Sequence, residues 1–503
     1  MMDVGIRNDG TWTMNSRTTA PGRRPRTLGR LSPKRLPAYL AAWLAMATLF
    51  PATPGRGGDR SVLIDGIHAN DLTTVGLGPE VYEYHQTTGY RRGFEYLRSR
   101  GVHCDRVTEG RLDAGRLSPY RLLFINLVSA ERPPFLVSEI AAIRSFVVQG
   151  GSLLVVTDHS NCYWHTFRLQ PLFTELDIES LSDTACDEPP QTLGNGNCWI
   201  TVTRFKPHPV TAGLRCLAMQ TGGCVDGRFA VAMTSERSWA DAWSTGMYGK
   251  ENAPGFLGNF RRDAGERAGP LGVVMAKSLG RGRIVVVADE NMLGESFVNY
   301  ADNYRLWLNA LAWLLDEPPL GDARTYEAWR SPRLQLYEQY DRAVFGSPDP
   351  AGCYHAMVLL SRFYWTFAGD RLSDPCDLLV FAYNDYALKA ETVAAVGAHL
   401  RRGKNVLVLN AEMRTLWDEL GVVASVLKGL GIARPKQHTE AGRLVIEVPG
   451  AGAIHVVGPD GILDNGVLPP PIRTPKAAEQ KPIRELLDAV RDALSPPKLT
   501  RAS

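Results

Sequence analysis

The chain has 503 residues, of which 44% are hydrophobic and 22% charged, as in ordinary globular proteins. Its formal net charge is only +3, and much of the basic excess precedes residue 36. The remaining chain is near neutral, which excludes the basic surface typical of a nucleic-acid-binding protein. The length exceeds what one hydrophobic core usually holds, so we expect two domains plus extensions.

The N-terminus has the pattern of an export signal. Basic residues, among them Arg23, Arg24 and Arg35, precede the apolar run Leu36–Phe50. This run is shorter than the ~20 residues that a membrane-spanning helix needs. We therefore predict that residues 1–58 hold a cleaved signal or an uncleaved signal anchor, which puts the rest in the periplasm or outside the cell. A buried N-terminal helix is the alternative.

Eight cysteines are present, and none is part of a Cys-x-x-Cys pair, so zinc-ribbon spacing is absent. Cys186 and Cys198 flank a loop rich in Pro, Gly and Asn, and Cys216 and Cys224 flank a Gly-containing segment. In an oxidising compartment each pair is expected to form a disulfide. Scattered reduced thiols are the alternative.

Strands and helices alternate along the first half. The expected strands are continuous and apolar, as in a parallel sheet, and amphipathic helices separate them. The predicted strands are 61–67, 102–107, 121–127 and 152–156, and the predicted helices are 90–100 and 135–149. Residues 157–270 are less regular and read as an insertion or lid. A hairpin of 271–277 with 283–288 and a helix at 303–315 complete a domain spanning 59–317.

The second half follows the same pattern on a smaller scale. We predict a linker over 318–352, a smaller α/β domain over 353–467 and a Pro-rich tail with one helix over 468–503. The expected strands are 356–360, 377–383 and 405–409, followed by a hairpin of 443–448 with 453–457. In both halves a strand, an Asn, a helix, a Gly and a strand follow at nearly equal spacing. This predicts an internal repeat, although any two βαβ units look alike.

Polar residues follow the strands of the first half. Because ligands bind at the carboxyl ends of strands in open parallel sheets, these residues are the candidate binding site. They are Asp65, His68, Asn126, Asp158, His159, Asn161, Asp289 and Glu290. Carboxylates with imidazoles suit metal coordination, acid–base chemistry or sugar binding. The alternative is that they only cap strand ends and turns.

No other motif of catalysis or nucleotide binding is present. Cys162 is flanked by Asn161 and Tyr163 rather than by small residues, which disfavours a nucleophile at this position. The sequence contains no His-Glu-x-x-His motif, no phosphate-binding Gly-x-x-x-x-Gly-Lys loop and no strand-to-helix Gly-x-Gly-x-x-Gly. No cofactor is expected.

Three stretches, 62–71, 150–165 and 280–293, carry a resemblance to class I glutamine amidotransferase-like domains. The chain is most similar to their ThuA-like and GIFT-type branch, and the resemblance implies two flavodoxin-like parallel-sheet α/β domains. That family keeps Gly-x-Cys-x-Gly where this chain has Thr157–Asn161, and a later His-x-Glu where it has Ala288-Asp289-Glu290. The catalytic cysteine is therefore absent.

These observations favour an exported or membrane-anchored, non-catalytic protein that binds a small molecule, a sugar or an envelope partner. The alternative is a glycan or ester hydrolase that uses Asp158, His159 and Asp289, with or without a metal ion.

Overall fold

The computed structural model describes residues 60–69, 89–242, 257–295, 297–321, 332–372, 376–440, 442–458, 463–470 and 475–495. The apolar run Leu36–Phe50 lies outside the described residues. Within the described ranges, every helix is too short or too polar to cross a membrane.

The first half forms an eight-stranded sheet with a parallel centre. Its order is β2 (His103–Val107), β1 (Ser61–Asp65), β3 (Leu122–Asn126), β4 (Ser152–Val156), β13 (Gly282–Val287), β12 (Gly272–Leu279), β9 (Ala230–Met233) and β7 (Arg204–Phe205). The first five strands pair in parallel and the last three antiparallel. The four strands predicted first are confirmed, and so is the β12–β13 hairpin.

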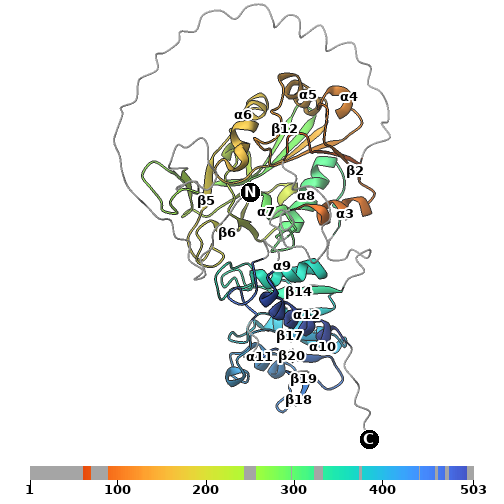
Figure 1. Cartoon of the computed structure of the whole chain (residues 1–503), viewed down its shortest axis with the longest axis vertical. Helices are drawn as coiled ribbons and strands as arrows, with labels where there is room; N and C mark the ends of the chain where they lie inside the picture. The colour runs from red at the N-terminus through yellow and green to blue at the C-terminus, as the bar shows by residue number, and fades with distance from the viewer. Residues whose placement is uncertain are drawn as a thin grey trace, which may run out of the picture. The chain divides into compact units, whose positions relative to one another are not determined.

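Helices cover both faces of this sheet. Figure 1 shows α4 (Ala114–Leu117), α5 (Val137–Val148) and α6 (His165–Glu175) on one face, and α3 (Arg91–Ser99), α7 (Glu290–Leu293) and α8 (Asn303–Leu315) on the other. The central strands are buried on both faces, which explains their continuous apolar sequences.

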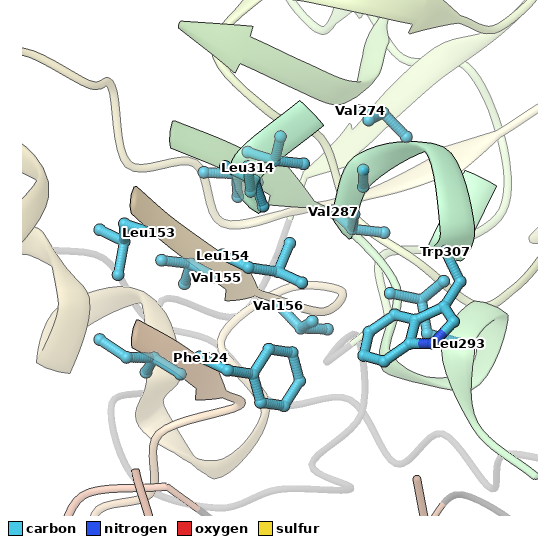
Figure 2. Close-up of a cluster of buried hydrophobic side chains, with 14 of the residues drawn as sticks. Phe124, Leu153, Leu154, Val155, Val156, Val274, Val287, Leu293, Trp307 and Leu314 are labelled. Atoms are coloured by element: carbon cyan, nitrogen blue, oxygen red, sulfur yellow. The ribbon is translucent and has the colours of Figure 1, made fainter. Parts of the chain in front are cut away.

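Aromatic rings fix the packing of α3 and α8 against the sheet. The ring centroids of Phe124 and Trp307 lie 5.9 Å apart, and those of Phe94 and Trp307 lie 5.6 Å apart, both in edge-to-face arrangements. Figure 2 shows Trp307 beside Phe124, Val156 and Leu293 in this core. The helix predicted at 303–315 is confirmed with these bounds.

Residues 157–270, which the sequence predicts to be an insertion or lid, contribute two strands to the main sheet. β9 and β7 extend the main sheet, and α6 packs against α5. The remaining strands form a three-stranded sheet of β11 (Arg267–Ala268), β10 (Trp239–Ala242) and β5 (Asp183–Cys186), and a pair of β6 (Trp199–Val202) with β8 (Leu217–Gln220). These strands have four residues or fewer, too few to establish a period in the sequence.

The second half forms a seven-stranded sheet. Its order is β15 (Trp365–Gly369), β14 (Arg333–Tyr337), β16 (Leu378–Phe381), β17 (Asn405–Val408), β20 (Ala453–Val456), β19 (Arg443–Glu447) and β18 (Lys436–Glu440). The helices are α9 (Tyr354–Phe363), α10 (Ala390–Arg401), α11 (Val422–Gly429) and α12 (Gln480–Leu494). The chain thus contains two flavodoxin-like α/β domains, as predicted.

The two sheets share one strand order. Position by position, β2-β1-β3-β4-β13-β12-β9 corresponds to β15-β14-β16-β17-β20-β19-β18. Sheets of one fold class share such an order without duplication, so the internal repeat stays a prediction.

Three expectations in the second half are wrong in detail. The predicted strand 356–360 lies inside α9, because a short apolar run fits a buried helix as well as a strand. The predicted linker 318–352 contains β14, an inner strand of the second sheet. Leu486 and Val490 of the tail helix α12 are buried among hydrophobic side chains of the second half. This helix is therefore part of the second domain and not an appended tail.

Candidate functional site

The predicted residues of the first half lie along one edge of the main sheet. β1, β3, β4 and β13 are parallel neighbours, and Asn126 pairs with Val156, which pairs in turn with Val287. The segments that carry Asp65, Asp158 and Asp289 therefore leave the sheet at the same carboxyl edge. This is the edge where open α/β sheets bind ligands.

Strand alternation divides these residues between the two faces. Ile64 pairs with Phe124, so both point toward α3 and α8. Asn126, two residues after Phe124, points to the same face, whereas Asp65, one residue after Ile64, points to the opposite face. Asp65 and Asn126 therefore do not face one another.

On the α5 face, Asp65, His68 and Glu139 form a buried network. His68 Nδ1 lies 3.0 Å from Asp65 Oδ2, and His68 Nε2 lies 3.5 Å from Glu139 Oε2. Asp65 also accepts a hydrogen bond from the backbone of Ile67, and Glu139 accepts one from Leu112. The network joins the end of β1 to α5, which gives Asp65 and His68 a structural role.

On the other side, Asp158 lies among further acidic groups. Burial raises the pKa of Asp158 well above its usual range, and the charges of Glu290 and Asp289 raise it further. Burial also raises the pKa of Asp289 to about 7. The hydroxyl of Tyr90 approaches the same group and donates a 2.7 Å hydrogen bond to the backbone oxygen of Glu290. Buried carboxyl groups that repel one another in this way favour a shared proton or a nearby positive charge.

The turn after β4 folds back on itself. Ser160, Tyr163 and Trp164 adopt positive φ angles of 50°, 50° and 65°. Such angles are unfavourable for residues other than glycine and are typical of functional turns. Donor atoms of Asp158, His159 and Cys162 all lie within 4.8 Å of one another as a result.

Two histidines support this turn. His165 Nδ1 lies 2.8 Å from the carbonyl oxygen of Cys162, and its Nε2 accepts a 3.3 Å hydrogen bond from the backbone N–H of Asp158. Nδ1 of His159 lies 3.2 Å from the hydroxyl of Ser160. Burial lowers the pKa of His159 to about 3, with a smaller contribution from His165, and burial lowers that of His165 to about 4. Both rings are neutral at pH 7.

Two predicted asparagines differ in role. Asn161 Oδ1 accepts hydrogen bonds from the backbone of Thr166 and Phe167, at 3.0 and 3.4 Å, and so caps the first turn of α6. The fully buried Asn126 has no hydrogen-bond partner for either amide atom within the part of the chain that the structure describes. A buried amide of this kind is either costly or completed by a bound molecule.

Sequence reasoning missed several residues of this site. Ser160, His165 and Tyr90 carry no motif, and only their distances to Asp158 and His159 reveal them. A cavity of about 10 Å³, room for about one water molecule, adjoins Thr157 and His165. A larger groove of about 550 Å³ lies at the carboxyl ends of β14 and β15, where Asp370 and Arg371 follow β15. The polar residues that directly follow β15 in the sequence could have predicted this groove.

All eight cysteines are free thiols. Cys186 and Cys198 lie close enough for their charges to interact. The disulfide between them stays a prediction. Residues 217–220, between Cys216 and Cys224, form strand β8, and the pairing of these two cysteines stays a prediction.

No known family profile and no curated protein matches the chain. Similar solved structures include the N-terminal domain of mmIFT52, which is 12% identical, covers 50% of this chain and 97% of its own, and has a TM-score of 0.36. ThuA-like proteins from Bacteroides uniformis (15% identity, 53% and 95% coverage, TM-score 0.28) and Parabacteroides merdae (13%, 53% and 92%, 0.29) are also similar. At TM-scores of 0.28–0.36, these similarities carry no conclusion about family or activity.

Proposed function

We propose that this chain is an amidotransferase-like protein without glutaminase activity, which binds a small molecule or a sugar at the carboxyl edge of its first sheet. The observation that supports this most is the buried acidic group of Asp158, Asp289 and Glu290 beside the strained turn after β4. A ligand with hydroxyl or amine donors offsets the electrostatic cost of such a group. An envelope protein presenting such groups is the corresponding macromolecular partner.

The absence of glutaminase activity rests on the chemistry of the same turn. Cys162 is 3% exposed and belongs to a small apolar cluster with Leu127. Nδ1 of His165 lies 3.8 Å from the sulfur of Cys162, but it is directed at the carbonyl oxygen of Cys162 instead. A thiol nucleophile needs access to its substrate, and the buried position of Cys162 does not provide it.

Ligand binding is tested by thermal unfolding of the full chain with a panel of sugars, polyols and amines, in the presence of a chelator. We expect at least one compound to raise the Tm of the wild type but not that of Asp158→Asn. The exposed Asp341→Asn is the matched control for loss of one negative charge and should respond like the wild type. Equal responses of all three proteins, or release of ammonia from glutamine by the wild type, would contradict the proposal.

A hydrolase acting on glycans or esters is the second candidate. The observation that favours it is the 3.2 Å contact between the Ser160 hydroxyl and His159 Nδ1 in a turn with left-handed backbone. A hydroxyl beside an imidazole is the arrangement of an activated nucleophile. Hydrolysis of a chromogenic ester that Ser160→Ala abolishes would favour this candidate over simple binding.

We also propose export, on the basic N-terminus followed by the apolar run Leu36–Phe50. An alkaline phosphatase fused after residue 60 should be active outside the cytoplasm. An inactive cytosolic fusion would reject export without affecting the ligand proposal.

A further inference from the structure

The turn after β4 gathers three different metal-binding donors. A carboxylate oxygen of Asp158, an imidazole nitrogen of His159 and the sulfur of Cys162 lie within 4.8 Å of one another. Ligand atoms on one tetrahedral zinc ion lie about 3.5 Å apart, given metal–ligand bonds of about 2.0–2.3 Å. Small side-chain rotations therefore suffice to bring the three donors onto one ion.

The local backbone explains this proximity. In an extended strand, the Cα atoms of residues 158 and 162 would be about 13 Å apart. The left-handed φ of Ser160 reverses the chain between them. The backbone N–H of Ala130, in the segment after β3, donates a 2.8 Å hydrogen bond to the carbonyl of Tyr163 and holds the turn in place.

The surrounding residues position the donors. His165 bonds the backbone at both ends of the turn, at Asp158 and Cys162, and is therefore a positioning residue. The contact of Ser160 with His159 Nδ1 orients that imidazole, as outer-shell partners of metal-bound histidines do. Asp289 and Glu290 add negative charge near Asp158, which a dication would offset.

We propose that Asp158, His159 and Cys162 bind one divalent transition-metal ion of the zinc type. A thiolate with an imidazole selects such ions over Mg²⁺ and Ca²⁺, which prefer oxygen ligands. On binding, the Cys162 thiol loses its proton to solvent as the sulfur–metal bond forms. Three protein ligands leave a fourth position for water or a ligand. The inference rests on the proposed function for the location of the binding site and adds the chemical class that binds there.

Cobalt(II) provides the direct test, because it replaces zinc in tetrahedral sites and absorbs light. The metal-free full chain titrated with Co²⁺ should show the visible bands of tetrahedral cobalt and a near-ultraviolet thiolate charge-transfer band, at one ion per chain. Cys162→Ser should lose the charge-transfer band. Cys104→Ser, a buried thiol on β2, is the matched control and should keep it. His159→Gln should weaken Co²⁺ binding at least about tenfold.

Absence of both bands in the wild type, or loss of the charge-transfer band in Cys104→Ser but not in Cys162→Ser, would overturn the metal site. If Cys162→Ser fails to fold by circular dichroism, X-ray absorption of the zinc-loaded wild type decides instead. One sulfur ligand supports the site, and none overturns it. The thermal-unfolding experiment contains a chelator and therefore tests ligand binding without a metal ion. A cobalt titration without bands would thus not affect the proposed function, and a panel in which no compound raises the Tm would not affect the metal site.

Discussion

The unfolding free energy should depend on pH through Asp289. Burial raises the pKa of this carboxyl from 3.8 to about 7, so the folded state binds its proton more tightly than the unfolded state. The resulting stabilisation is complete below pH 3.8 and is lost as the pH rises through 7. At pH 5, two units below the folded pKa, it amounts to about 3 kcal/mol, and at pH 8 it is close to zero.

Asp289→Asn should remove this dependence. Asn caps α7 nearly as well as Asp, and loss of the Asp289 oxygen that accepts from Gln220 lowers stability at every pH alike. The difference in unfolding free energy between variant and wild type should thus change by about 2–3 kcal/mol between pH 5 and pH 8, in favour of the variant at pH 8. Relief of the charge on Asp158 adds in the same direction.

The assay is urea denaturation followed by circular dichroism at pH 5, 6, 7 and 8, with a chelator present and Asp341→Asn as the control. Stabilities of the variant and the wild type that run parallel over this range would contradict a raised pKa of Asp289. That result would mean that Asp289 is ionised throughout and that its burial is compensated by the backbone hydrogen bonds alone.

Three further substitutions test the surroundings of the site. Asn126→Leu should raise the unfolding free energy by about 1–3 kcal/mol, because a buried amide without partners is removed, and a loss of stability in urea denaturation would show that the amide is satisfied. Asn161→Ala should lower it by about 1 kcal/mol through loss of the α6 cap, an effect that Asn161→Asp should largely avoid. Trp307→Ala should lower it by about 3–5 kcal/mol, and a change below 1 kcal/mol would contradict the aromatic core between α3, α8 and the sheet.

Much of the first domain could be predicted because its strands are buried on both faces. Runs such as Leu122–Asn126 and Ser152–Val156 contain only one polar residue each, and Gly150 and Gly151 separate the second run from the helix before it. A continuous apolar run bounded by turn residues is typical of a strand that is buried on both faces. The second domain was harder, since β14 lies between segments rich in Pro and Gly and alternates Arg333, Gln335 and Tyr337 with leucines.

The position of the site could also be predicted, but its internal geometry could not. The carboxyl edge follows from parallel pairing alone. The face of the sheet to which each side chain points depends on how the residues of neighbouring strands pair. This pairing places Asp65 and Asn126 on opposite faces. The gathering of Asp158 with Cys162 depends on the positive φ of Ser160, for which a serine gives no sequence signal.

Binding at the carboxyl edge of the first sheet is tested most directly by native mass spectrometry of the full chain purified from its own host. We expect a non-covalent adduct on the wild type and on Asp341→Asn that is lost in Asp158→Asn, while circular dichroism shows all three proteins folded. An adduct that persists in Asp158→Asn, or a wild type that carries none, would contradict binding at this edge.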